Sequence, residues 1–426
     1  MDHLILSKPG KSTNCTIQLT GSKSESNRAL ILNALSKGKV DVKNLSSADD
    51  TVTLENVLKD GKSGSREDGK SESLIDLSPS LTEVNIGPAG TAMRFLTAYF
   101  AITGTEVVLT GTERMKLRPI GILVDALRKM GANIEYVEKD GFPPIKFSNE
   151  FYQTTNKVNI KGDISSQFIT ALLLVAPSLA KGLELTIEGE LTSKPYVQMS
   201  LSMLKEAGIN HQWNDSVISI APQKFIESEI TVEPDWSAAS YWYSIAALSD
   251  ESTINLPYLK ENSLQGDSRI SSIMESFGID TKYTAEGLTL TKTLRTIKGD
   301  FFDLKDCPDL AQTIIVISAA LGHNATFTGL ETLKIKETDR IAALQNELAK
   351  IGVTLTEDNQ QYHLDCSNLH FPERISIKTY EDHRMAMAFA PLALKINTLE
   401  IEEPQVVGKS YPAFWEDLKK AGFVVG

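Results

Sequence analysis

Six times along the chain, an amphipathic, helix-like stretch ends in a glycine. These glycines recur about every 70 to 77 residues, and samples read LRKMGANIEY, LKEAGINHQW, MESFGIDTKY and LAKIGVTLTE. Glycine suits the left-handed position just past a helix end, and an apolar, β-prone run follows five of the six. Such regular self-similarity indicates one structural unit copied six times. The glycines are Gly61, Gly131, Gly208, Gly278, Gly352 and Gly422.

A second set of helix-like stretches lies between these glycines. Each opens with small or polar residues and then becomes apolar on nearly every side, which is typical of a buried helix. The N–H groups and the positive dipole end at a helix start favour an anion. We therefore expect six buried helices with exposed starts that can bind anions. Their sequences are SESNRALILNAL, AGTAMRFLTAYFAI, SSQFITALLLVAPSLA, WSAASYWYSIAAL, DLAQTIIVISAAL and HRMAMAFAPLAL.

Length and charge limit what the chain can bind. Its 426 residues allow two or three domains, and six units divide naturally as three plus three. The formal charge of −12 argues against nucleic acid or an anionic membrane as a partner, so an anionic ligand needs local clusters of Lys and Arg. We recognise no signal peptide and no apolar stretch long enough to span a bilayer. Three widely spaced cysteines fit a reducing cytosol, and the histidine spacing predicts no metal site.

Alternating helical and β-prone runs predict α/β layering. The pattern breaks at a proline near Thr231–Asp235, so we expect a first three-repeat lobe at residues 20–233. The second lobe should be discontinuous, combining 1–19 with 234–426, because the segment Leu4–Leu19 precedes the first repeat and can pair with the second half. The stretch Lys62–Ser73 lacks apolar residues and is expected to be a mobile, solvated loop.

The first two buried helices open with groups suited to anions. Lys23, Ser24 and Arg28 combine an ammonium, a hydroxyl and a guanidinium, which suits a phosphate or a carboxylate. At the second helix, Gly90 lets an anion approach the backbone, and Thr91 can cap the helix. Each motif alone is equally consistent with an ordinary helix entry carrying surface charge.

The next motifs are also ambiguous when taken singly. RMKLRP places three cations in five residues, although a charged surface loop would look the same. The SSQ motif at Ser165, Ser166 and Gln167 heads a very apolar helix, where it can bind phosphate or hydroxyls or simply cap. The motif SKPY, from Ser193 to Tyr196, is similar.

The second half carries carboxylates as well as cations. Asp309 opens the fifth buried helix, as a simple cap or as a general base for a nearby substrate hydroxyl. The motif KETDR packs four charges into five positions, which a salt-bridged exposed helix face would also explain. Asp382, His383 and Arg384 open the sixth helix, and Lys409 follows in GKSYP. Because these groups recur at the same phase of the repeat, we expect helix starts to converge on an anion-binding cleft between two domains.

Together, the strings KSESNR, AGTAMR, RMKLRP, SSQF, SKPY, KETDR, DHRMAM and GKSYP resemble the 5-enolpyruvylshikimate-3-phosphate synthase family. They occur in matching order from about Gly21 to Pro412. The resemblance implies an α/β fold of two similar domains, each of three βαβαββ units in an inside-out barrel-like arrangement, with the active site in the interdomain cleft. It implies that the enolpyruvyl group of phosphoenolpyruvate moves to the 5-hydroxyl of shikimate 3-phosphate by addition–elimination, releasing phosphate, in chorismate and aromatic amino-acid biosynthesis.

The matching motifs assign residues to each substrate. By resemblance, shikimate 3-phosphate is held by Lys23, Ser24, Arg28, Ser165, Ser166, Gln167, Ser193, Tyr196, Asp309 and Lys336. Phosphoenolpyruvate is held by Lys23, Gly90, Arg118, Gln167, Arg340, Arg384 and Lys409. The reacting centre contains Asp309, Glu337, Lys409, His383 and Lys23. The resemblance implies no cofactor and no metal, and a cytoplasmic monomer that acts on small molecules and closes on binding them.

Asp309 is our choice for the base that takes the hydroxyl proton. Glu337 and Lys409 are expected to bring a proton to the vinyl carbon and remove it again, in a division that the residues leave open. Retention of Gly90 predicts sensitivity to glyphosate, because a side chain here would crowd that inhibitor. Pro88 and Phe95 stand where many bacterial members have Asn and Pro, and Thr332 stands where an Asn is common.

Two competing readings follow from the same residues. The sister family that adds enolpyruvate to UDP-N-acetylglucosamine usually carries a cysteine in the loop corresponding to Gly111–Pro119, and this loop, GTERMKLRP, has none. A non-catalytic phosphometabolite-binding protein would have lost its acid–base residues, whereas Asp309, Glu337, His383 and Lys409 are all present. Both readings are therefore less favoured than the synthase.

Overall fold

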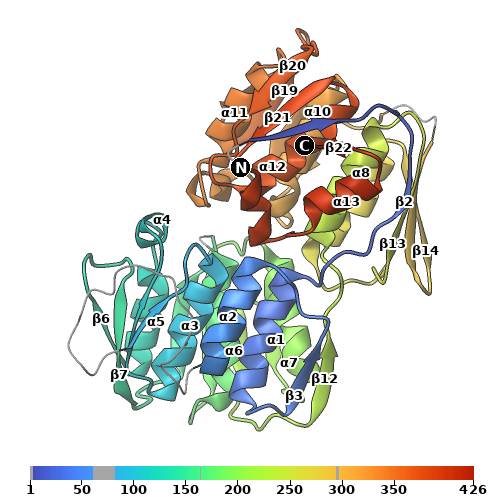
Figure 1. Cartoon of the computed structure of the whole chain (residues 1–426). Coiled ribbons are helices and arrows are strands. Elements are labelled where there is room, and N and C mark those ends of the chain that lie inside the picture. The colour runs from blue at the N-terminus through green and yellow to red at the C-terminus, as the bar shows by residue number, and fades with distance from the viewer. Residues whose placement is uncertain (1–2, 61–81, 164, 294–296) are drawn as a thin grey trace, which may run out of the picture. The chain divides into compact units, whose positions relative to one another are not determined.

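The computed structural model describes residues 3–60, 82–163, 165–293 and 297–426 (Figure 1). The chain divides into two compact units. One, here called the continuous unit, is Lys23–Val232, and the other, the split unit, joins Met1–Ser22 to Glu233–Gly426. Gly61 and the expected mobile loop Lys62–Ser73 lie outside the described residues.

The second set of stretches forms six helices that are largely buried, as predicted. Every residue of α10 and α12 is buried, and beyond the first turn these helices carry apolar or small side chains on all sides. Within each unit the three buried helices pack against one another, and Figure 1 shows α1, α3 and α6 side by side. They are α1 (Lys23–Leu35), α3 (Gly90–Thr103) and α6 (Ser166–Val175) in the continuous unit, and α8 (Trp236–Leu248), α10 (Ala311–Ala320) and α12 (His383–Phe389) in the split unit.

The starts of these helices are less exposed than the sequence led us to expect. Only 1% of His383 and 5% of Arg384 is exposed at the start of α12, and Lys23 and Ser165 are half-buried. Lys23 pairs with Asp50 and Arg384 pairs with Asp309, each within its own unit, so these two charges are compensated. The prediction of exposed starts was therefore wrong, although the helices themselves are where it placed them.

The amphipathic helices pack outside the buried ones and end as predicted. The five described repeat glycines all have a positive φ, from 74° at Gly352 to 110° at Gly131, and a strand follows each. Contacts pair α2 with α1, α5 with α3, α7 with α6, α9 with α8 and α11 with α10. These helices are α2 (Asp49–Asp60), α5 (Gly121–Met130), α7 (Lys194–Glu206), α9 (Ile270–Glu275), α11 (Arg340–Ala349) and α13 (Phe414–Lys420).

In the described ranges, five four-stranded sheets share one pattern, in which a parallel pair is extended by two antiparallel strands. The continuous unit holds two of these sheets. The strand order of the first is β4 (Thr82–Asn85), β5 (Val107–Thr110), β7 (Ile145–Phe151), β6 (Ala132–Tyr136). The strand order of the second is β8 (Lys157–Lys161), β9 (Leu183–Glu188), β11 (Val217–Ile220), β10 (Gln212–Asn214). This unit also holds the parallel pair β3 (Val40–Lys43) and β12 (Ser228–Thr231).

The three sheets of the split unit include both N-terminal strands. In β1, Leu4 lies opposite Ile401 of β21, and in β2, Cys15 lies opposite Ile254 of β13. These pairings tie the first residues of the chain to its second half. The sheets run β2 (Thr13–Thr16), β13 (Ser252–Pro257), β15 (Gly287–Lys292), β14 (Ile279–Thr284); β16 (Phe301–Asp303), β17 (Ala325–Thr328), β19 (Gln361–Asp365), β18 (Thr354–Asp358); and β20 (Arg374–Ile377), β21 (Thr398–Glu402), β1 (His3–Ser7), β22 (Val424–Val425).

Repetition of the same helix-and-sheet module explains the regular glycines. Buried helices pack on several of these sheets, as α3 does on β5, β6 and β7 and α8 does on β13 and β15, and amphipathic helices contact others, as α9 does β14 and α11 does β18. Among the helices of the described ranges, none has the length and apolar character needed to cross a membrane.

Candidate functional site

The split unit gathers cations and carboxylates at the starts of its helices, and we call this group the charged cluster. Its members come from four short segments of the split unit that are well separated in sequence. They are Asp309 in the 3₁₀ helix η3 (Pro308–Leu310), Glu337 before α11, Arg340 as the first residue of α11, Asp382, His383 and Arg384 at the start of α12, and Lys409 at the end of the 3₁₀ helix η6 (Pro404–Lys409).

Arg340 contacts the carboxylates of the charged cluster. Its guanidinium is 2% exposed and contacts three carboxylates: Nε lies 2.6 Å from Asp382 Oδ2, Nη2 lies 2.9 Å from Glu337 Oε2, and Nη1 lies 3.3 Å from Asp309 Oδ1. Burial by itself would lower the pKa of Arg340, but these three carboxylates outweigh burial and raise it above the ordinary value. Arg340 therefore keeps its charge while fixing three acidic groups in place.

Asp309 joins Arg340 to Arg384. Arg384 Nη2 lies 2.8 Å from Asp309 Oδ2, and Arg384 Nη1 donates to the Asp309 backbone carbonyl at 3.2 Å. Burial alone would raise the pKa of Asp309, but Arg384, Lys336 and Arg340 together hold it below the ordinary range. No side chain caps α10, so reading Asp309 as a simple helix cap was wrong.

Glu337 bridges Arg340 to Lys409. Its Oε1 lies 2.9 Å from Lys409 Nζ, while its other oxygen contacts Arg340. Asp339 caps α11 by accepting from Ile341 N at 3.1 Å, so most of the KETDR motif lies before the helix. The alternative reading of this motif as an exposed helix face was therefore wrong. Lys336 is half-buried in the same turn, and its charge acts on Asp309.

Asp382 is a cluster member that the sequence places at the opening of the sixth buried helix but to which the sequence reasoning assigned no role. It is 0% exposed, accepts from Arg384 N at 2.8 Å as the cap of α12, and also binds Arg340. The ring of His383 is buried beside it, with Nδ1 3.6 Å from Asp382 Oδ1. An aspartate directly before a buried helix was the available signal, since this residue type commonly caps helices.

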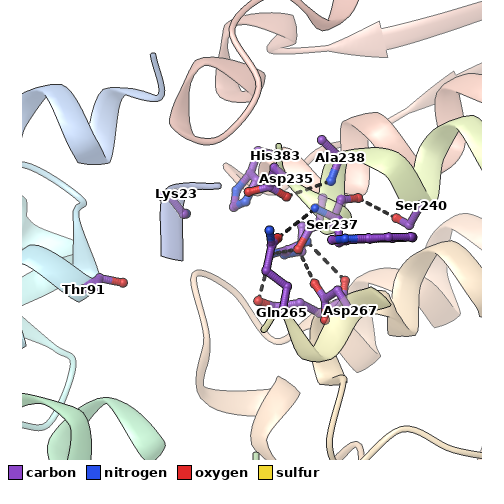
Figure 2. A network of polar contacts seen from close by, with 12 residues as sticks. Lys23, Thr91, Asp235, Ser237, Ala238, Ser240, Gln265, Asp267 and His383 are labelled. Carbon is purple, nitrogen blue, oxygen red and sulfur yellow. Dashed lines mark hydrogen bonds and ion pairs between the residues drawn. The ribbon is translucent and has the colours of Figure 1, made fainter. Parts of the chain in front are cut away.

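A polar network at the start of α8 extends the charged cluster (Figure 2). Asp235 caps α8 through Ala238 N at 2.9 Å, and the Ser237 hydroxyl donates to the buried carboxylate of Asp267. Ser237 Oγ also lies 3.5 Å from Arg384 Nη2. Burial, followed by the charge of Asp309, raises the pKa of Asp267 to about 7. Sequence reasoning missed Ser237 and Asp267 because neither belongs to a charged motif.

The continuous unit holds its basic groups differently. Lys23 Nζ lies 3.2 Å from Asp50 Oδ2. Arg28 is 3% exposed, and its guanidinium donates to Ser200 Oγ at 2.9 Å, the Ser24 carbonyl at 2.7 Å and the Tyr196 carbonyl at 3.2 Å. Burial lowers the pKa of Arg28 to about 10, which leaves it charged at neutral pH. Arg28 thus brings together Ser24 and Tyr196, two predicted partners of one substrate.

Two other features frame this part of the continuous unit. The Arg28 guanidinium lies over the rings of Phe95, at 5.6 Å, and Tyr196, at 5.9 Å. Phe95 stands where many bacterial members of the family have Pro, and here its ring packs against the Arg28 guanidinium. Ser193 is the residue before α7, with a φ of 56°, and makes no side-chain cap there.

Gly90 and Arg118 are neighbours, as their shared assignment requires. A Cβ placed on Gly90 would lie 2.6 Å from Arg118 Nη1, so the guanidinium rests directly against this backbone. Arg94 fixes the arrangement by donating to the Gly90 carbonyl at 3.0 Å and to the Pro119 carbonyl at 3.2 Å. The loop that carries Arg118 follows the short helix α4 (Glu113–Lys116) and is tied to α3 in this way.

The start of α6, the third buried helix of the continuous unit, carries the remaining predicted residues of this unit's helix starts. Ser165 caps α6 by accepting from Gln167 N at 3.3 Å, as predicted, and Ser166 is the first residue of the helix. Gln167 Nε2 donates to Thr91 Oγ1 at 3.2 Å. Thr91 does not cap α3, which has no side-chain cap, so that prediction was wrong. Within the described ranges, no cluster of His, Cys, Asp and Glu is arranged to hold a metal ion.

Comparison with known proteins gives one consistent match. Residues 7–418 match the family model of EPSP synthase (3-phosphoshikimate 1-carboxyvinyltransferase). The chain is 46% identical over 421 residues to 3-phosphoshikimate 1-carboxyvinyltransferase of Bacteroides fragilis (strain YCH46), covering 98% of both chains. It is 35% identical over 428 residues to the protein of the same name in Xenorhabdus nematophila, covering 97% of each. Its fold is similar to that of EPSP synthase from Acinetobacter baumannii, with a TM-score of 0.77, 20% identity and full coverage of both chains.

Proposed function

We propose, because this chain belongs to the EPSP synthase (3-phosphoshikimate 1-carboxyvinyltransferase) family, that it transfers the enolpyruvyl group of phosphoenolpyruvate to the 5-hydroxyl of shikimate 3-phosphate. The products are 5-enolpyruvylshikimate 3-phosphate and phosphate, on the route to chorismate and the aromatic amino acids. The observation that carries the proposal is the charged cluster, in which Arg340 links two candidate proton carriers, Asp309 and Glu337, and Glu337 also pairs with the third, Lys409.

The substrates are held mainly by cations, since both are multiply anionic. Phosphoenolpyruvate contacts the cations near Gly90 and in the charged cluster, and shikimate 3-phosphate contacts the hydroxyl-rich starts of the helices of the continuous unit. The phosphoenolpyruvate set is Lys23, Gly90, Arg118, Gln167, Arg340, Arg384 and Lys409, and the shikimate 3-phosphate set is Lys23, Ser24, Arg28, Ser165, Ser166, Gln167, Ser193, Tyr196, Asp309 and Lys336.

In the addition step, Asp309 takes the proton of the 5-hydroxyl as its oxygen bonds to C2 of phosphoenolpyruvate. Arg384 holds Asp309 in its ionised, weakly basic form. When an anionic group of phosphoenolpyruvate engages Arg384, the carboxylate loses part of this stabilisation and its pKa rises. Binding of the second substrate thereby turns Asp309 into a stronger base at the moment it is needed.

The vinyl carbon gains a proton and then gives one up. Protonation makes C3 a methyl group, and the later loss of a proton from that methyl re-forms the double bond as the C2–O bond to phosphate breaks. Glu337 and Lys409, 2.9 Å apart, carry these two transfers between them. Arg340 and the neighbouring cations stabilise the charge that develops on the departing phosphate. His383 and Lys23 complete the reacting centre as hydrogen-bond donors.

We also propose that the chain acts as a monomer in the cytoplasm and that glyphosate inhibits it. The contact between Gly90 and Arg118 supports inhibition, because an anion beside that backbone meets a guanidinium and no Cβ. No inhibition at millimolar glyphosate would contradict this part of the proposal. A sedimentation measurement that gives a dimer would contradict the monomer.

Phosphate release from phosphoenolpyruvate tests the proposed reaction with the purified protein. We expect release that depends on shikimate 3-phosphate and little or none with UDP-N-acetylglucosamine. The absence of a cysteine from the loop Gly111–Pro119 favours this acceptor choice. Equal or faster release with the sugar nucleotide would assign the chain to the sister reaction, and no release with either would identify a binding protein.

A further inference from the structure

A strained turn stands directly before the residues that begin α12. The Asp382 N–H donates to the Thr379 carbonyl at 2.9 Å, which closes a four-residue turn. Both central residues have a positive φ, 54° at Tyr380 and 57° at Glu381. Tight turns with positive φ at both centres strongly prefer Asn and Gly, and other side chains pay a conformational cost there. Contacts with residues outside the turn must therefore stabilise this backbone conformation.

A buried carboxylate on α11 holds one side of the turn. Glu347 is 1% exposed, and its Oε1 accepts from the Tyr380 hydroxyl at 2.9 Å while its Oε2 accepts from Lys378 N at 3.2 Å. Lys350 Nζ donates to the same carboxylate at 2.6 Å and to the Ser376 carbonyl at 2.9 Å. Three donors thus compensate the burial of this charge, and the contacts fix the chain from β20 into the turn.

The other side of the turn is held from the segment that delivers Lys409. The buried Thr379 hydroxyl donates to Glu403 Oε2 at 3.0 Å. Glu403 is the residue before η6, it also has a positive φ, 48°, and η6 ends at Lys409. One turn is therefore tied both to α11, whose first residue is Arg340, and to η6.

We propose that two pairs of residues, Tyr380 with Glu347 and Thr379 with Glu403, form a clamp that holds the 379–382 turn. In this proposal they are positioning residues, and through the turn they aim Arg384 and Lys409 at phosphoenolpyruvate. This inference rests on the proposed function. It assigns the positioning of Arg384 and Lys409 to residues that do not themselves take part in the reaction. Without the clamp, the turn relaxes toward unstrained backbone, and Asp382 and Arg384 shift from the positions that their ion pairs define. Misplacement of a binding group by a fraction of an ångström weakens the substrate that it holds.

The test removes single hydroxyls from the clamp. Tyr380→Phe deletes the bond to Glu347, and Thr379→Val deletes the bond to Glu403 with little change of shape. The matched control is Tyr243→Phe, because Tyr243 is a buried tyrosine of the same unit whose hydroxyl bonds to Thr281 Oγ1, also at 2.9 Å. We expect both clamp variants to raise KM for phosphoenolpyruvate by about tenfold and KM for shikimate 3-phosphate by less than about twofold. The control should lower Tm without this split.

Hydrogen exchange of the backbone amides of residues 378–384 gives a second readout that needs no substrate. Exchange there should be faster in Tyr380→Phe than in the unsubstituted protein, and unchanged in the control. If the unsubstituted protein turns over and the clamp variants match the control in KM, the inference is overturned. If the unsubstituted protein does not turn over, the proposed function fails, and unchanged exchange at these amides would overturn the clamp independently.

Discussion

The two units hold their charged residues in different ways. In the split unit, the guanidinium of Arg340 contacts three carboxylates, and Lys409 pairs with one of them. In the continuous unit, the guanidinium of Arg28 bonds to hydroxyls and backbone carbonyls, which do not ionise at neutral pH. The difference indicates a division of labour. Under the proposed function, the split unit supplies the proton carriers Asp309, Glu337 and Lys409, and both units supply cations that hold the substrate anions.

The largest expected effect is on the proton carriers of the split unit. Glu337→Gln keeps the shape of the side chain but cannot shuttle a proton, so we expect kcat to fall by about 10² to 10⁴-fold. The dissociation constant for shikimate 3-phosphate, measured by calorimetry, should change by less than about threefold. Glu357→Gln is the matched control, because Glu357 also pairs with a lysine in this unit, at 2.7 Å, but lies on the surface. Equal activity of the two variants would remove Glu337 from the reacting centre.

A smaller effect, on binding rather than on chemistry, is expected in the continuous unit. Gly90→Ala places a Cβ 2.6 Å from Arg118 Nη1, so the guanidinium must move. We expect KM for phosphoenolpyruvate to rise about tenfold and glyphosate inhibition to weaken, with a smaller change in kcat. Gly10→Ala is the control, since no atom lies within 4 Å of that added Cβ. A loss confined to kcat would contradict the division between the units.

The smallest expected effect concerns the stability of the split unit. The pKa of Asp267 is raised in the folded protein, from 3.8 to about 7, so the folded form binds more protons than the unfolded form between these values. Stability is therefore lost as pH rises through that range, and Asp267→Asn removes the loss. The advantage of the variant in Tm should grow from about pH 5 to about pH 8. An advantage that is constant with pH would show that Asp267 is not the titrating group.

Much of the fold could be predicted because local sequence and global packing agree. The helices that are apolar on every side are buried, and the five described repeat glycines take the left-handed conformation. Some of the residues that motifs assign to the candidate site also lie together, since Gly90 and Arg118 meet within one unit and Asp309, Arg340 and Arg384 meet in the other.

The features that could not be predicted from the sequence depend on contacts between residues that are far apart in the chain. The turn at Tyr380 and Glu381 has residues that disfavour a positive φ, so local propensity predicts no such turn, and only the distant Glu347 and Glu403 explain it. Asp267 likewise lies far from any charged motif and reaches Arg384 through Ser237. Exposed helix starts were expected because the partners that bury them lie elsewhere in the chain.

The most direct test of the account is turnover in D₂O, followed by mass spectrometry of the enolpyruvyl product. If the split unit adds a deuteron to the vinyl carbon, and the resulting methyl group rotates before it loses one of its three hydrogens, deuterium enters the vinyl position of the product. We predict such incorporation in the presence of phosphoenolpyruvate and shikimate 3-phosphate together. Product formed with an entirely unlabelled vinyl group would contradict addition–elimination, and with it the role given to Glu337 and Lys409.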